Sequence, residues 1–179
     1  MFLEEAKAVA ALGKHPSIVT IFEFSEYQGR KYFVLEFVGS HAGMLLRVHP
    51  KGLPIEMALR IGKESAEGLA YAHKRYIIHR DIKPANIMLE IEGGSAKLAD
   101  FGSSVLRREG TKTRDTLMGE RGTLVYMDPR LFDPAASITA ASDVYSFGVM
   151  AWQVFTGRTP YEAEVAAMLP PTATVAQQL

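Results

Sequence analysis

The residues of this sequence that could do chemistry are concentrated in two short stretches. Residues 79–86 read HRDIKPAN, which places an aspartate, a lysine and an asparagine close together. A second carboxylate, Asp100, follows a short apolar run. Carboxylate and amide oxygens are ligands that Mg²⁺ prefers, and a carboxylate that holds no metal can accept a hydroxyl proton. The two stretches predict a magnesium site at Asn86 and Asp100, with Asp81 beside it as a general base.

A β-hairpin is needed to bring these groups together. Residues 92–95 read EGGS, which is typical of a turn between two short strands. The apolar residues on either side, 87–89 and 97–99, would form the strands. In such a hairpin, Asp81, Asn86 and Asp100 would lie at the same end.

The HRDIKPAN loop followed by the tripeptide DFG at residues 100–102 resembles the protein kinase family. The resemblance implies that Asp81 orients the attacking hydroxyl and accepts its proton, and that Lys83 reaches the transferring phosphate. It further implies that ATP is the phosphate donor and that Asn86 and Asp100 bind Mg²⁺. A lysine two residues after this aspartate is typical of serine/threonine kinases. The resemblance therefore implies a protein substrate that carries Ser or Thr.

The same resemblance implies a site for adenine and a residue that helps to hold the ATP phosphates. The backbone of Glu36 and Val38 would bond the adenine edge, and Met88 would contribute to its floor. Glu5 matches the helical glutamate that pairs with a lysine from a preceding strand in kinases. His79 is expected to be structural, packed beneath Phe101.

The predicted elements give an α+β fold, with a helix over 3–12 and a hairpin of strands 18–24 and 31–38. Residues 39–43 are expected to be a flexible connector. Pro54 should open a long helix to about residue 75, with Ile55 and Leu59 on its apolar face. A helix that is apolar nearly all round, and therefore buried, should follow Ser142 as its N-cap.

In the kinase-like interpretation, these elements form an incomplete small lobe and a mainly helical large lobe. Residues 1–38 would be a partial small lobe of one helix plus a two-stranded hairpin. Residues 39–168 would be the large lobe, without the last helices of the family, and residues 169–179 a disordered tail.

A polar stretch, residues 103–122, directly follows the tripeptide DFG and resembles an activation segment. Its phosphorylation candidates are Thr111, Thr113 and Thr116, and a merely mobile surface loop is the alternative for each. Beyond it, residues 128–130 read Asp-Pro-Arg where kinases usually read Ala-Pro-Glu. The usual glutamate pairs with an arginine of a later helix, so this departure puts the usual anchor in doubt. Asp143 resembles the aspartate that holds the catalytic-loop backbone.

The composition of the 179 residues excludes several classes of protein. Lysine and arginine total 20 and so do aspartate and glutamate, and this balance does not favour nucleic acid as a partner. No cysteine is present, which fits a cytoplasmic location. The most apolar stretch, residues 144–155, is too short to span a membrane.

Three functions compete. The first is a serine/threonine protein kinase core, here truncated. The alternative is a non-catalytic kinase-like module that binds nucleotide or a partner protein, because no glycine-rich loop or strand lysine precedes the first helix. A small-molecule phosphotransferase is disfavoured by the long activation segment.

Overall fold

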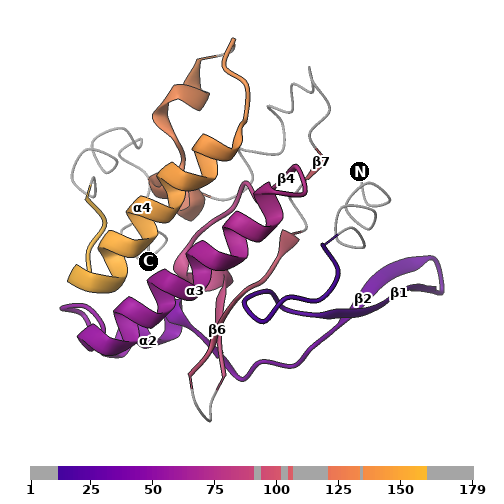
Figure 1. Ribbon diagram of the computed structural model, residues 1–179, viewed down its shortest axis with the longest axis horizontal. Helices are drawn as coiled ribbons and strands as arrows, with labels where there is room; N and C mark the ends of the chain where they lie inside the picture. The colour runs from indigo at the N-terminus through magenta and orange to yellow at the C-terminus, as the bar shows by residue number, and fades with distance from the viewer. Residues whose placement is uncertain (1–11, 91–93, 102–104, 107–120, 134, 161–179) are drawn as a thin grey trace.

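The computed structural model describes residues 12–90, 94–101, 105–106, 121–133 and 135–160 (Figure 1). The predicted helix over 3–12 and the tail 169–179 lie outside this part, apart from Leu12. In chain order the elements are β1 (Ile21–Tyr27), β2 (Arg30–Leu35), β3 (Ser40–His41), α2 (Ala42–Val48), α3 (Ile55–His73), β4 (Ile77–Ile78), η1 (Pro84–Asn86), β5 (Ile87–Leu89), β6 (Ala96–Leu98), β7 (Val105–Leu106), η3 (Arg121–Tyr126), η4 (Pro129–Phe132) and α4 (Ala140–Thr156).

The first hairpin is antiparallel, as predicted, but its turn is tighter and lies later in the chain. β1 and β2 pair from Ile21↔Leu35 to Tyr27↔Arg30. Gln28 and Gly29 form the turn with φ of 50° and 75°, and positive φ at both positions suits the twist of a two-residue hairpin.

Residues 18 and 19, which were predicted to begin the first strand, instead run along β6 together with Ser17. Ile18 makes a parallel bridge with Leu98, and Val19 N donates to Leu98 O at 2.8 Å. Leu98 N donates to Ser17 O at 2.9 Å. These bonds tie the chain just before β1 to the hairpin that carries Asp100.

The second hairpin confirms the sequence prediction. β5 pairs antiparallel with β6 from Ile87↔Leu98 to Leu89↔Ala96. β3 adds to the other edge of β5, giving the sheet order β3-β5-β6. The prediction of a flexible connector over residues 39–43 is wrong, because residues 40–43 form β3 and the start of α2.

Helix α3 runs along the middle of the described structure and contacts β6 and α4 (Figure 1). Ala58, Ile61, Gly68 and Leu69 are among its buried residues. Gly68 crosses β6 so closely that a Cβ atom there would stand 2.7 Å from Ser17 O and 2.9 Å from Leu98 Cδ1. The predicted apolar face was partly wrong, because Ile55 and Leu59 are exposed.

Helix α4 packs beside α3 and is capped differently from the prediction. Thr139, not Ser142, is the N-cap, and Ser142 completes a capping box from the third helical position. Gly157 ends the helix in the left-handed region, with φ of 77°. The prediction that α4 is buried all round was also wrong, because Val144 and Trp152 are exposed while Met150 is fully buried.

The main core lies where α3, α4, the β5–β6 hairpin and the loop after β4 meet. Its fully buried side chains include Ile61, Ile77, Ile82, Ile87, Leu98 and Met150. None of the described helices combines the length and apolarity needed to cross a membrane.

Candidate active site

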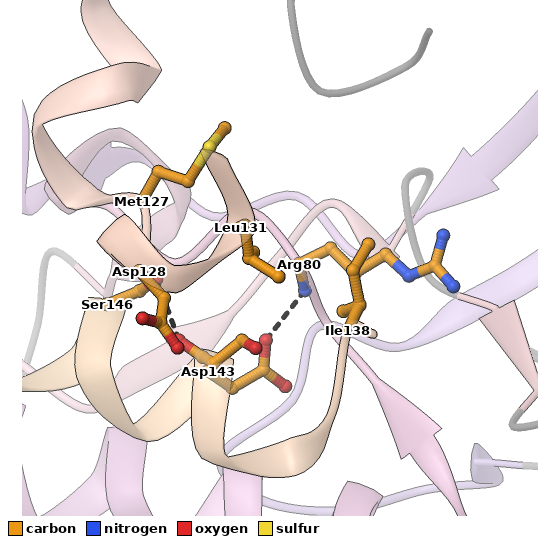
Figure 2. A pocket seen from close by; sticks show the side chains of 8 residues that line it. Arg80, Met127, Asp128, Leu131, Ile138, Asp143 and Ser146 are labelled. Atoms are coloured by element: carbon orange, nitrogen blue, oxygen red, sulfur yellow. Dashed lines mark hydrogen bonds between the residues drawn. The ribbon is translucent and has the colours of Figure 1, made fainter. Parts of the chain in front are cut away.

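Asp143 of α4 bonds the backbone of the loop between β4 and η1, residues 79–83. Asp143 is fully buried, and its carboxylate accepts hydrogen bonds from His79 N and Arg80 N, both at 2.8 Å. Figure 2 shows the bond to the Arg80 amide. His73 Nε2 bonds the same carboxylate at 2.7 Å. The expectation that Asp143 holds this loop is confirmed.

Two residues with unusual backbone angles flank the site. Arg80 has φ of 73° and Asp100 has φ of 61°, in the left-handed region that residues with a Cβ seldom adopt. Such conformations persist only where surrounding contacts impose them, and they are concentrated at functional sites. For Arg80, the bond from its amide to Asp143 supplies one such contact.

Asp81, Lys83 and Asn86 come together around one carboxylate. Lys83 Nζ lies 2.9 Å from Asp81 Oδ2. Asn86 Nδ2 donates to Asp81 Oδ2 at 2.9 Å and to Asp81 O at 2.7 Å. Both amide hydrogens of Asn86 are thereby used, which leaves its Oδ1 as the atom able to ligate a cation. The Asp81 side chain is 15% exposed.

The β5–β6 hairpin carries Asn86 and Asp100 at one end. Asn86 directly precedes β5, and its carbonyl accepts a hydrogen bond of 2.9 Å from Ala99 N, directly before Asp100. The described residues hold no group of three or more His, Asp or Glu side chains that could bind a metal ion.

A third contact joins the two loops through His79, as predicted. The His79 ring packs on Phe101 with ring centroids 4.5 Å apart, and its Nε2 bonds Ala99 O at 3.0 Å. His79 is fully buried. His79 therefore links the loop that carries Asp81 to the residues on either side of Asp100 and does not face solvent.

Asp81 and Lys83 thus lie in the loop before η1, and Asn86 and Asp100 lie at one end of the β5–β6 hairpin. Comparison with known proteins shows the family to which the chain belongs. The sequence profile described as the protein kinase domain matches residues 1–172. The chain belongs to the protein kinase family. The other expected fold features, an α+β arrangement with a small two-stranded sheet and three described α-helices, are those of a partial kinase domain.

The kinase domain is similar to several curated bacterial proteins. It is 32% identical over 166 residues to a probable serine/threonine-protein kinase, pknA2, of Bifidobacterium longum, covering 91% of this chain and 21% of that protein. It is 32% identical over 176 residues to serine/threonine-protein kinase PrkC of Bacillus subtilis, covering 94% and 25%. For serine/threonine-protein kinase PknB of Mycobacterium leprae the identity is 35% over 167 residues, covering 89% and 26%. The chain thus spans about a fifth to a quarter of the length of these relatives.

Two of the predicted adenine-binding residues of the kinase domain adjoin the β3-β5-β6 sheet. Val38 is buried and lies two residues before β3. Met88 lies in the centre of β5, opposite His41 of β3 and Lys97 of β6. The third, Glu36, bonds the residue directly before β1, since its amide donates to Thr20 O at 2.8 Å.

Lys97 is a residue of this region that the sequence analysis missed. Its ammonium bonds Glu36 and lies 2.8 Å from Glu90 Oε1. Burial would lower the pKa of Lys97, but the bonds to Glu36 and Glu90 outweigh it and raise that pKa. A lysine alternating with the inward residues Ala96 and Leu98 was the available signal.

Tyr126, at the end of η3, was also not singled out. Its hydroxyl donates to Gln153 Oε1 of α4 at 2.6 Å. Burial raises the pKa of Tyr126 to about 12; the bond to Gln153 opposes this rise, and the negative charge of Asp81 adds to it. The end of η3 therefore lies within electrostatic reach of Asp81.

Several predicted residues lie outside the described part of the chain. They are Glu5 and the activation-segment threonines Thr111, Thr113 and Thr116.

Proposed function

We propose that the protein transfers the γ-phosphoryl group of ATP to serine or threonine hydroxyls of a protein substrate. The observation that carries this proposal is the convergence of Lys83 and Asn86 on the carboxylate of Asp81. Membership of the protein kinase family and the serine/threonine kinases among its relatives support it. In this proposal the chain supplies the catalytic core.

In this mechanism Asp81 is the general base. Among the described residues Asp81 Oδ1 has no hydrogen-bond partner, whereas Oδ2 is bonded by Lys83 and Asn86. A substrate hydroxyl would supply the donor that Oδ1 lacks. The hydroxyl oxygen forms a bond to the γ-phosphorus while the bond from that phosphorus to the bridging oxygen breaks. ADP leaves, and the hydroxyl proton passes to Asp81.

Lys83 and the two cation ligands would act on the phosphate charge. The Lys83 ammonium, 2.9 Å from Asp81, would contact the transferring phosphoryl oxygens and hold them next to the base. We infer that the metal is Mg²⁺, held by Asn86 Oδ1 and Asp100. One carboxylate and one amide oxygen suit Mg²⁺, which keeps further positions for water and substrate phosphates. When bound, Mg²⁺ would neutralise charge that develops on the phosphates.

The adenine end of ATP would lie along the segment after β2. We propose that the backbone of Glu36 and Val38 bonds the adenine edge and that Met88 forms part of its floor. The bonds of Glu36 to Thr20 and Lys97 support this assignment, because they fix the segment next to β6. Glu5, which lies outside the described residues, would be the glutamate that pairs with a lysine at the ATP phosphates in kinases. The absence of cysteine favours a cytoplasmic location.

The experiment that tests this function is phosphate transfer to a protein carrying serine and threonine, followed in the full-length protein. Asp81→Asn should lower the transfer rate by at least about a thousandfold, because the amide cannot accept the proton. The affinity for ATP should change little. Asp133→Asn, at an exposed aspartate that caps a turn, is the matched control and should keep the wild-type rate.

Each outcome of this experiment decides something. Unchanged transfer in Asp81→Asn would remove Asp81 from the role of base. A wild-type protein that binds ATP but transfers nothing would overturn the enzyme assignment in favour of the non-catalytic binding module.

A further inference from the structure

The segment that follows η3 contains an ion pair between Asp128 and Arg130, the two residues at which this chain departs from Ala-Pro-Glu. Asp128 is the N-cap of η4, and its Oδ1 accepts a hydrogen bond from Arg130 N at 3.0 Å. The guanidinium of Arg130 also bonds it in a fork, with Nε 3.1 Å from Oδ1 and Nη2 2.6 Å from Oδ2. The forked bond is the strongest geometry between an arginine and a carboxylate.

The Asp128 carboxylate is buried, and that makes its partner important. Its side chain is 2% exposed, whereas that of Arg130 is 69% exposed. Asp128 lines the same hollow as a second buried carboxylate, Asp143 (Figure 2). A buried carboxylate is costly unless it is bonded, and a like charge nearby adds to the cost.

The two carboxylates have separate partners. Asp143 is bonded by His73 and by the amides of His79 and Arg80. All the hydrogen bonds described for the Asp128 side chain come from Arg130. The hydrogen bonds from Arg130 hold the pKa of Asp128 below its ordinary value, so this carboxylate stays charged at neutral pH. Loss of Arg130 would leave it unpaired.

The pair is placed where it can position the segment that leads away from Asp81. On one side, Tyr126 is bonded to Gln153 of α4 and lies within electrostatic reach of Asp81. On the other, Leu131 N donates to Asp128 O at 2.9 Å, which begins η4. Within residues 124–132, Tyr126 is thus bonded to α4, and Asp128 is bonded by Arg130 and Leu131 of the same segment.

We propose that Arg130, acting through Asp128, is a positioning residue that fixes residues 124–132 and so determines how a protein substrate docks beside Asp81. The inference rests on the proposed function and deepens it. In the family, the glutamate at this position pairs with an arginine in a later helix. Here residue 130 carries the opposite charge and makes its ion pair two residues away.

Steady-state kinetics of the full-length protein separate this role from a general loss of structure. Arg130→Met should raise the KM for the protein substrate about tenfold, because an unpaired buried carboxylate shifts the segment. The KM for ATP should stay within about twofold of wild type, since the bonds described for Glu36 run to Thr20 and Lys97 and not to this pair. Arg130→Lys should give an intermediate KM, because one ammonium cannot reproduce the fork. Arg158→Met, the same change at an exposed arginine beyond α4, is the control and should match wild type.

A second measurement keeps the inference testable apart from catalysis. Hydrogen exchange of the Leu131 and Met127 amides should be about tenfold faster in Arg130→Lys than in wild type, while the Arg80 amide is unchanged. This comparison stands even if the wild-type protein transfers no phosphate, a result that would refute only the proposed function. The inference is overturned if Arg130→Met leaves the KM for the protein substrate unchanged or raises both KM values equally. Identical exchange at Leu131 in Arg130→Lys and wild type would overturn it as well.

Discussion

A single residue of this kinase domain, Asp143, supports the backbone of the loop that carries Asp81. Asp143 is fully buried, yet three hydrogen bonds offset the cost of its burial. Two of them come from backbone amides of the loop, so the carboxylate supports the left-handed turn at Arg80 directly. The position of Asp81 therefore depends on a residue of another helix, α4.

Replacing Asp143 by asparagine tests this support. The amide keeps one acceptor oxygen, but its NH₂ group would face a backbone N–H in a buried place. We expect Asp143→Asn to lower the free energy of unfolding by about 3 kcal/mol. Urea denaturation measures the change, with Asp133→Asn as the control at an exposed aspartate, expected to lose about 0.5 kcal/mol or less. Equal losses in both variants would contradict the supporting role.

At the scale of elements, α3 crosses β6 at close range. Gly68 permits it, because a Cβ atom would stand 2.7 Å from the backbone oxygen of Ser17. Residues 17–19 are themselves bonded to Leu98. Neither this segment nor β6 can therefore move away from the other without breaking backbone hydrogen bonds.

Two glycines of the same helix provide a matched pair of substitutions. Gly68→Ala should lower the free energy of unfolding by about 1–3 kcal/mol, because the added methyl group meets backbone at less than contact distance. Gly62→Ala has open space around its Cβ and should raise that free energy by about 0.5–1 kcal/mol. Denaturant unfolding of both variants checks the signs. Stabilisation by Gly68→Ala would show that the crossing is looser than described.

The elements that could be predicted from sequence are those with strong local signals. The turn at residues 92–95 and the apolar residues beside it predicted the β5–β6 hairpin, and Pro54 predicted the start of α3. The buried face of α3 could not be derived from sequence. Ile55 and Leu59 match a helical period but are exposed, because the buried face is set by contacts with β6 and α4, which are distant in sequence. The same holds for the cap of α4, where both Thr139 and Ser142 have the required hydroxyl.

The candidate site was easier to predict than its supports. Asp81, Lys83 and Asn86 fall within six residues of chain, so local geometry brings them together. Lys97 bonds Glu36 across 61 positions of sequence, and no local pattern names that partner. The Asp128–Arg130 pair is local, but only the burial of Asp128 shows why the arginine is needed.

At the scale of the whole molecule, Lys97 joins the segment after β2 to the hairpin of the site. Its ammonium bonds Glu36, whose Oε2 accepts a hydrogen bond from Thr20 N at 3.0 Å. Burial would raise the pKa of Glu36, but these bonds outweigh it and lower that pKa. The pKa of Glu90 is lowered by the bond from Lys97. Lys97 is 13% exposed, so the network is shielded from solvent more than a surface ion pair.

Lys97→Met should lower the free energy of unfolding by about 1 kcal/mol at neutral pH. The lowered pKa values of Glu36 and Glu90 make their contribution present above the usual glutamate value of 4.5 and lost as the pH falls below it. The raised pKa of Lys97 makes its contribution present below 10.5 and lost as the pH rises above it. The difference between variant and wild type should therefore be a plateau between these two pH values.

Urea unfolding across this pH range checks the plateau. Lys63→Met is the control, since Lys63 makes only an exposed pair with Glu67 at 3.7 Å and should lose about 0.3 kcal/mol. A difference that does not shrink at either end of the range would show that lost packing, and not charge, causes the effect of Lys97→Met.

The central claim is that Asn86 and Asp100, at one end of a hairpin, hold Mg²⁺ for the phosphates of ATP next to Asp81. Calorimetric titration of ATP into the protein, with and without Mg²⁺, tests it most directly. The account predicts that Mg²⁺ strengthens ATP binding by at least about tenfold in the wild type and much less in Asp100→Ala. Equal affinity for ATP with and without Mg²⁺ in the wild type would contradict the account, as would full Mg²⁺ dependence in Asp100→Ala.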